Sequence, residues 1–196
     1  MTDLRALSRR LVAAHEPVLV QGDVLRASAV LLLLYEQQGR EYVLFQERTQ
    51  EVQHHKGEVS LPGGRRDPED GTLEDTALRE TDEEIGVVRE HIEVFGALDE
   101  VATRSSNYVI SPFVGAITQP GAYFFRTAQS EVKELLIVPL DHLTDAASAE
   151  WRVIEDGEDA TAEREFHYDG HRIWGATARI VGQYIDLLAH GEGATA

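Results

Sequence analysis

Apolar positions recur along the chain with two different spacings, and the spacing predicts which segments are helices and which are strands. Near the N-terminus, Leu4, Leu7 and Leu11 fall three or four positions apart, which predicts an amphipathic helix over residues 2–15. A similar pattern predicts a C-terminal helix over residues 175–189. The apolar side of that second helix consists of Ile180, Tyr184, Ile185 and Leu188.

Shorter apolar runs predict strands. The densest run covers residues 27–35, and after a turn around Gly39 a returning strand at residues 42–46 completes a hairpin. Further strands are predicted at residues 93–102, 108–118, 134–139, 163–167 and 172–174, with a turn at Arg104–Asn107 between the first two. Helices before, between and after mixed strands predict an α+β fold, an α/β/α sandwich.

The length of 196 residues suits a single domain over residues 1–196. Within this domain, residues 1–25 are predicted as a helical N-terminal extension and residues 191–196 as a frayed tail. The longest apolar run is far too short to cross a bilayer, and the N-terminus has no secretory apolar region, so we expect no membrane partner. With no cysteine in the chain, a cytoplasmic location is the default expectation.

Residues 72–85 carry helix signals at both ends. Thr72 and Asp75 have the spacing of a capping box, and Gly86 suits the position just after the last turn. One stripe of this helix, at Leu78, Thr81 and Ile85, is predicted to pack inward.

Four acids fall within five positions of this helix. Glu80 and Glu84 share one stripe with Glu83 beside them, and clustered carboxylates are the hard oxygen ligands that Mg²⁺ or Mn²⁺ prefers. A solvated acidic face, with Arg79 as a surface partner, is the alternative interpretation. Just upstream, Pro62-Gly63-Gly64 lets the backbone approach a ligand, or forms a plain tight turn.

The formal net charge of −17 bears on the choice of partner. A protein that binds nucleic acid relies on a basic surface to neutralise phosphates, so we expect no nucleic-acid partner. Solubility is the simple explanation of the acidity. A substrate that carries phosphate would need bound metal to approach this chain.

Gly64 through Val87 resembles the Nudix box, in which a glycine precedes the run Arg-Glu-apolar-x-Glu-Glu-x-Gly-apolar. Arg79, Glu80, Glu83, Glu84, Gly86 and Val87 fill the second half of the box, with Thr81 at a usually apolar position. Fourteen residues separate Gly64 from Arg79 where the pattern has thirteen. The first acid of the box therefore has two candidates, Asp70 and Glu69.

This resemblance implies a Nudix fold, with a mixed β-sheet between helices, and hydrolysis of nucleoside diphosphate derivatives that depends on Mg²⁺ or Mn²⁺. It implies that Glu80, Glu83 and Glu84 are metal ligands and that Arg79 orients a glutamate through a charge-assisted hydrogen bond. A main-chain carbonyl at Gly63 is a further candidate ligand. For removal of a proton the candidate is Glu131, with Glu134 and Glu100 as alternatives.

The segment from Leu44 to Gly64 resembles the extra motif of coenzyme A diphosphatases. Matches are Leu44, Arg48, Gly57, Pro62, Gly63 and Gly64, and departures are Phe45, Gln46, Thr49, Gln53 and Leu61, of which Gln53 replaces an arginine. The resemblance implies a small-molecule substrate of the coenzyme A type, cut at its diphosphate. Candidate substrate-binding residues are Arg48, His55, Lys56, Gly64, Arg65 and Arg66, with His54 as a further cation.

Other interpretations stay open at this stage. The same metal chemistry would serve hydrolysis of ADP-ribose or a dinucleotide. A module that binds nucleotides without turnover would keep the fold, although it has no need for all of Glu80, Glu83 and Glu84. Association into a homodimer is a further expectation.

Overall fold

The computed structural model describes residues 3–21, 26–49, 57–103, 107–119, 121–156 and 159–193. Its helices are α1 (Leu4–Ala14), α2 (Leu73–Ile85), α3 (Leu140–Thr144) and α4 (Gly175–Gly193), with short 3₁₀ turns η1 (Arg89–His91) and η2 (Ala146–Ser148). Its first six strands are β1 (Arg26–Gln37), β2 (Arg40–Arg48), β3 (Val59–Ser60), β4 (Gly63–Arg65), β5 (Ile92–Ala97) and β6 (Val101–Ala102). The remaining strands are β7 (Tyr108–Ile117), β8 (Val132–Pro139), β9 (Ala149–Asp156), β10 (Asp159–Tyr168) and β11 (His171–Ile173).

The main sheet is mixed. Its strands follow the order β3-β2-β1-β7-β5, and β4, β6 and β8 pair with β1, β7 and β2. Strand β1 runs parallel to β7 but antiparallel to β2 and β4. A smaller antiparallel sheet has the order β11-β10-β9. The predicted hairpin and the mixed sheet are confirmed.

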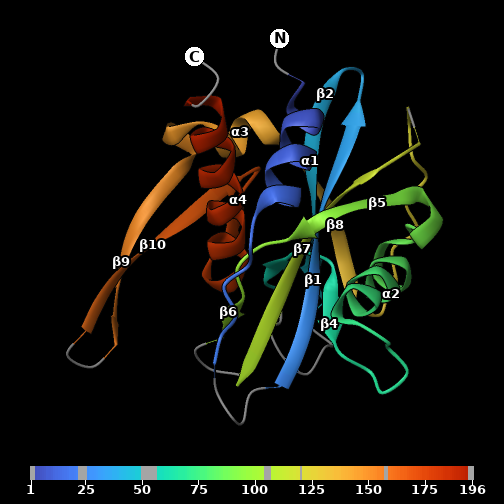
Figure 1. Cartoon of the computed structure of the whole chain (residues 1–196), viewed down its shortest axis with the longest axis horizontal. Helices are drawn as coiled ribbons and strands as arrows, with labels where there is room; N and C mark the ends of the chain where they lie inside the picture. Colours follow the sequence, from blue (N-terminus) through green and yellow to red (C-terminus); the bar gives the residue numbers. More distant parts are fainter. Residues whose placement is uncertain are drawn as a thin grey trace.

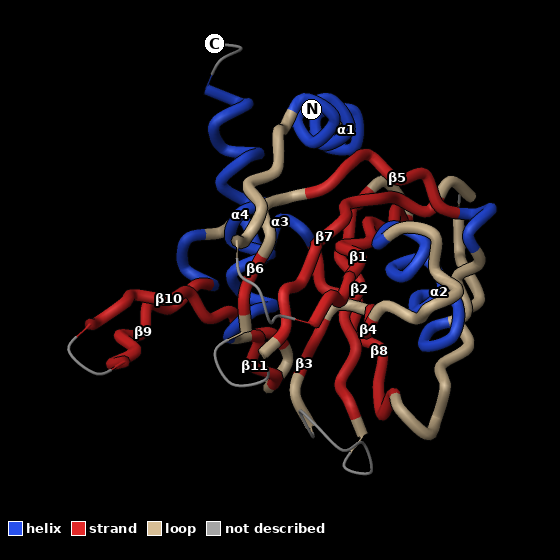
Figure 2. The backbone as a smooth tube through the Cα atoms, turned by 60° about the horizontal axis from the view of Figure 1, so that its bottom comes forward, coloured by secondary structure: helices blue, strands red, loops and turns tan. Residues whose placement is uncertain are grey.

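The apolar run of β1 is buried on both faces of the main sheet. Leu32 and Leu34 pack in one cluster with residues of α1 and α4. Leu31 and Leu33 pack in another cluster with residues of α2. Figure 1 and Figure 2 show the result, with α2 on one side of the sheet and α1 and α4 on the other. The predicted α+β sandwich is therefore confirmed.

Helix α2 begins and ends where its sequence signals predict. The Thr72 side chain accepts from the Asp75 N–H, the Asp75 carboxylate accepts from the Thr72 N–H, and Gly86 ends the helix in the left-handed conformation. Leu78, Thr81 and Ile85 are all buried, as expected. The Thr81 hydroxyl donates to the Ala77 carbonyl at 2.7 Å, which allows a threonine at this apolar position.

Some predicted elements were wrong or incomplete. The strand expected at residues 93–102 is interrupted between β5 and β6, because residues 98–100 leave the sheet and bind the segment after α1. There, Asp99 and Glu100 accept the backbone N–H groups of Val18 and Val20 at 2.9 Å. The sequence pattern also missed α3, β3, β4 and β9.

The two ends of the chain differ from expectation as well. In the extension at residues 1–25, only α1 is helical among the described residues, and it packs on the core. Residues 191–193, which the sequence assigned to a frayed tail, are helical, because α4 continues through Gly193. A side chain at Gly191 would collide with Leu11, so glycine lets α4 approach α1 closely. Residues 194–196 lie outside the described part.

No helix in the part of the chain that the structure describes is long and apolar enough to cross a membrane.

Candidate active site

The candidate site forms where α2 packs against β4. Strand β4 pairs with β1, so residues 63–65 run alongside the helix that carries the acids. A Cβ atom at Gly64 would lie 2.4 Å from the carboxyl carbon of Glu80. A Cβ atom at Gly63, where φ is +149°, would lie 2.3 Å from the Ala29 carbonyl oxygen. Gly63 is therefore required by close packing against backbone, whereas a side chain at Gly64 would displace the Glu80 carboxylate.

Arg79 connects the acids of the site through four hydrogen bonds and donates a fifth to a backbone carbonyl. Its Nη1 donates to Glu80 and to Glu83, each at 3.0 Å. Its Nε and Nη2 donate to the two carboxylate oxygens of Asp70, also at 3.0 Å, and Nη2 reaches the Arg65 carbonyl at 3.2 Å. These contacts are those that the proposed orienting role of Arg79 requires.

Asp70, rather than Glu69, is the acid that pairs with Arg79. Its buried carboxylate also accepts the Thr76 hydroxyl at 2.9 Å and the Asp67 N–H at 2.9 Å. Hydrogen bonds from the Arg79 guanidinium hold the pKa of Asp70 far below its usual range, and Asp70 in turn raises the pKa of Arg79. Glu69 is exposed. Since Asp70 follows Gly64 at the spacing of the box, the extra residue lies between Asp70 and Arg79.

Glu84 is only 2 % exposed, although it belongs to the acidic run. Its Oε2 accepts the Gly63 N–H at 2.8 Å, and its Oε1 accepts from Arg48 Nη1 at 3.2 Å. Burial raises the pKa of Glu84 to about 7, and the nearby charge of Glu80 adds to the rise. Burial also raises the pKa of Glu80.

The donor set suits a divalent cation. Glu80, Glu83 and Glu84 offer hard oxygen ligands, and the charges of Glu83 and Glu80 raise the pKa values of Glu80 and Glu84, respectively. A cation would relieve the cost of placing these like charges together. Glu83 remains accessible, with its side chain 60 % exposed. The residues therefore fit Mg²⁺ or Mn²⁺.

The structure brings some of the other candidates to this site. Arg48 contacts Glu84, as described, and Glu131 is close enough for its charge to raise the pKa of Glu80. Arg65 and Arg66 follow Gly64 and are exposed, and Arg66 donates to the carbonyls of Asp70 and Gly71 at 3.1 Å.

Other candidates lie elsewhere or outside the described residues. Glu134 lies near His171 of β11, and Glu100 accepts from Ser111 at 2.7 Å, so neither joins the acids of α2. Gln53, His54, His55 and Lys56 lie outside the described residues. Sequence reasoning named Gln46 only as a departure from the coenzyme A motif and not as a site residue, although it is fully buried within reach of Glu84. The only sequence signal was a polar residue in a run of apolar ones.

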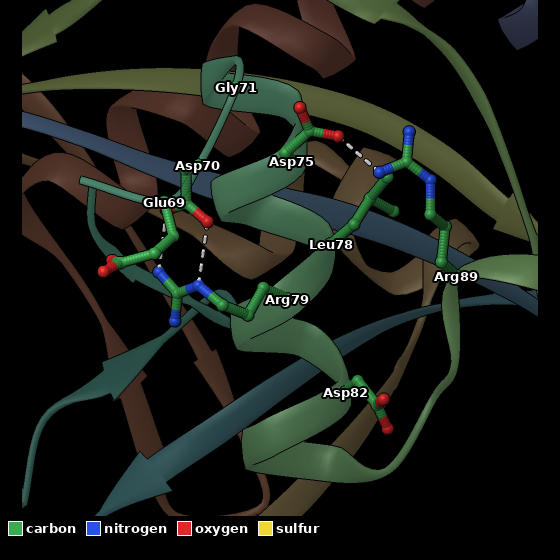
Figure 3. A pocket seen from close by; sticks show the side chains of 8 residues that line it. All are labelled: Glu69, Asp70, Gly71, Asp75, Leu78, Arg79, Asp82 and Arg89. Carbon is green, nitrogen blue, oxygen red and sulfur yellow. Dashed lines mark hydrogen bonds and ion pairs between the residues drawn. The ribbon is translucent and has the colours of Figure 1, made fainter. Parts of the chain in front are cut away.

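A pocket of about 320 Å³ lies on the outer side of α2 (Figure 3). Asp70 and Arg79 line it on one side, and Asp75 and Arg89 form an ion pair on the other. Glu69 and Asp82 contribute further acids to its wall. Because acids outnumber arginines and neither Glu80 nor Glu84 lines it, this pocket does not suit an anionic substrate.

Comparison with known proteins agrees with this geometry. The family model described as the NUDIX domain matches residues 25–168, and the chain belongs to the Nudix hydrolase family. Nudix hydrolase 3 of Caenorhabditis elegans is 33% identical over 199 residues, which cover 94% of this chain and 82% of that protein. The mitochondrial coenzyme A diphosphatase NUDT8 of Mus musculus is 35% identical over 169 residues, 84% of this chain and 79% of that protein.

Solved structures show the same fold. The Nudix hydrolase RenU from M. smegmatis is 26% identical, with a TM-score of 0.50 over 63% of this chain and 82% of that one. A MutT protein from Methanosarcina mazei Go1 is 15% identical, with a TM-score of 0.51 over 93% and 99%. The chain is thus a hydrolase that acts on a pyrophosphate bond in nucleoside diphosphate derivatives.

The raised pKa of Glu84 predicts how the stability of the metal-free protein depends on pH. The folded state holds a proton on Glu84 up to about pH 7, whereas the unfolded chain releases it near 4.5. Between these values the folded state binds more protons, so the free energy of unfolding falls as the pH rises. The loss attributable to Glu84 is expected to reach up to about 3 kcal/mol.

Urea unfolding in the presence of a chelator, at pH 5 and pH 8, measures this loss. Glu84→Gln cannot titrate, so its stability should fall less across the same interval than that of the unchanged protein. Asp70 does not interfere, because its lowered pKa places its effect at more acidic pH. Equal losses in the two proteins would contradict the prediction.

Proposed function

We propose that this chain hydrolyses the diphosphate linkage of coenzyme A or its derivatives with Mg²⁺ or Mn²⁺, giving 3′-phosphoadenosine 5′-phosphate and 4′-phosphopantetheine. The observation that carries the proposal is that the segment resembling the coenzyme A motif meets the Nudix acids. Arg48 and Gly63 of that segment both bind the carboxylate of Glu84. The similarity to a protein named as a coenzyme A diphosphatase supports the same substrate.

In this proposal Glu80, Glu83 and Glu84 hold the cation, with the Gly63 carbonyl as a further candidate ligand. A bound divalent cation would neutralise charge on the diphosphate oxygens and lower the pKa of water. Arg79 keeps Glu80 and Glu83 in place, and its own position is fixed by the bidentate pair with Asp70. Glu131, near Glu80, is the candidate acceptor for the proton of the attacking water.

Binding of the substrate phosphates is assigned to the cations around β4. Arg65 and Arg66 are exposed next to Gly64, which lets the main chain approach the acids closely. His55 and Lys56 remain proposed contacts for the same anionic groups. Arg48 has a second proposed role in substrate binding, besides its ion pair with Glu84.

Steady-state kinetics of the purified protein with a panel of substrates and Mg²⁺ or Mn²⁺ tests this proposal. Coenzyme A is expected to give the highest kcat/KM, above ADP-ribose, dinucleotides and nucleoside triphosphates. A higher kcat/KM for ADP-ribose or a dinucleotide would assign the chain to another Nudix activity. Absence of turnover with every substrate would favour a module that binds nucleotides without catalysis.

A variant of Arg48, the arginine of the coenzyme A motif, tests its proposed contact with the substrate. Arg48→Lys keeps the positive charge but loses the fork geometry of the guanidinium. If Arg48 contacts the substrate in addition to its contact with Glu84, the variant should raise KM for coenzyme A. An unchanged KM with lower kcat would restrict Arg48 to its contact with Glu84.

Two further expectations remain proposals. A cytoplasmic location rests on the absence of cysteine, whereas the name of the mouse relative places that protein in mitochondria. A homodimer is also proposed, and sedimentation of the purified chain would test it.

A further inference from the structure

A second group of ligand-type side chains lies away from the acids of α2. Its members are Glu47 on β2, Glu134 on β8 and His171 on β11. Each offers one ligand atom, and these atoms all lie within 4.8 Å of one another. Strand β11 packs beside β3 at this place, where the smaller sheet meets the main one (Figure 2).

The cluster lies on the opposite face of the main sheet from the Nudix acids. Successive side chains of a strand point to opposite faces. Glu47 lies two positions along β2 from Phe45, which packs in the cluster with residues of α1 and α4, so Glu47 points to that face. Glu134 has the same orientation, because Leu136, two positions along β8, packs in the cluster with α4.

The His171 ring lies between the two carboxylates, with Nδ1 3.6 Å from Glu47 Oε2 and Nε2 3.8 Å from Glu134 Oε2. Only one of these nitrogens would bind an ion, and small side-chain movements would bring it and the two carboxylates around a common centre. Both distances are too long for direct hydrogen bonds. Two ligands that each lie about 2.1 Å from one metal ion are separated by roughly 3 to 4 Å.

A buried carboxylate oxygen that accepts no hydrogen bond is a second observation. Glu47 is 8 % exposed, and its Oε2 is buried and receives no hydrogen bond from the described residues. The other oxygen, Oε1, accepts from the exposed Lys133 at 2.7 Å. Leaving a buried anionic oxygen unsatisfied is costly, and this oxygen points towards His171.

We propose that Glu47, Glu134 and His171 bind one divalent transition-metal ion, Zn²⁺ in preference to Mg²⁺. An imidazole nitrogen favours Zn²⁺ over Mg²⁺, and two carboxylates balance its charge. Lys133 stays on Oε1 while the metal takes Oε2. The site joins β11 of the smaller sheet to β2 and β8 of the main sheet, so its role is structural and separate from hydrolysis.

The test measures Zn²⁺ binding in a background that lacks Glu80 and Glu84, two of the three candidate Nudix metal ligands. Tag-free Glu80→Gln/Glu84→Gln protein, freed of metal by a chelator, is titrated with Zn²⁺ in a calorimeter. One Zn²⁺ per chain is expected to bind and to raise Tm. Adding His171→Gln or Glu134→Gln should each weaken this binding by about 100-fold and abolish the rise in Tm.

Glu150→Gln is the matched control, because Glu150 lies 3.7 Å from His167 and forms a Glu–His pair outside the cluster. It should leave Zn²⁺ binding unchanged. If His171→Gln fails to fold, Glu134→Gln decides, since the Glu134 side chain is 55 % exposed and its replacement is expected to leave the fold intact. The proposal is overturned if the background protein takes up no Zn²⁺, or if uptake persists unchanged in Glu134→Gln. Coenzyme A hydrolysis is not a readout, so the two proposals fail separately.

Discussion

Replacing Glu84 by glutamine is expected to lower kcat by on the order of 10³-fold or more while the fold remains intact. The carboxylate is one of three candidate metal ligands, and the amide has the same shape but no charge. Because burial opposes ionisation of Glu84, the neutral side chain should not destabilise the metal-free protein. The loss therefore belongs to catalysis. Steady-state kinetics at saturating Mg²⁺, together with a urea unfolding curve, measures both effects.

Asp82→Asn is the control on the same helix. Asp82 is exposed and outside the contacts of Arg79, so its replacement removes one negative charge without touching the proposed ligands. Its kcat is expected to stay within about twofold of the unchanged protein, since an exposed charge has weak effects at physiological ionic strength. Near-normal turnover in Glu84→Gln would reject the metal site on α2. A large loss in Asp82→Asn would instead point to the overall charge of the helix.

Gly64→Ala is expected to reduce kcat/KM by about 100-fold with little change in stability. The added methyl group would lie 2.4 Å from the carboxyl carbon of Glu80, well inside van der Waals contact. Glu80 is the flexible end of a long side chain, so it can move aside at low cost in folding free energy. Moving it by about 1 Å, however, displaces a proposed ligand and breaks its geometry with Arg79.

Gly182→Ala provides the comparison for this prediction. Gly182 lies in α4, and a Cβ there would meet Arg164 only at 3.7 Å, an ordinary contact. Alanine in a helix interior should leave activity unchanged and raise stability by up to about 1 kcal/mol. If Gly64→Ala retains full kcat/KM, the close approach of β4 to Glu80 has no role in catalysis.

Much of α2 could be predicted because its signals are local. The capping box at Thr72 and Asp75 and the terminal Gly86 act within one turn of each helix end. Which acid pairs with Arg79 could not be predicted from such local signals. The loop is one residue longer than the pattern, and only the folded loop brings Asp70 rather than Glu69 to the guanidinium.

The burial of Glu84 could not be predicted from the sequence for a different reason. Glu83 and Glu84 look alike in an acidic run, but β4 and Arg48 cover only Glu84. That covering arises from residues far apart along the chain. Strand β9 was missed although Ala149, Trp151 and Val153 alternate with polar residues, and in the structure Trp151 and Val153 are exposed.

The neighbours Glu47 and Arg48 make β2 intolerant of misalignment. An irregularity in its pairing with β8 falls between these two residues, opposite Val132 and Glu134. If β2 slipped by one position, the acid would enter the carboxylates of α2 and the arginine would face His171. Like charges would then meet on the face of α2, so electrostatic repulsion there reinforces the apolar pattern in selecting a single alignment of this strand.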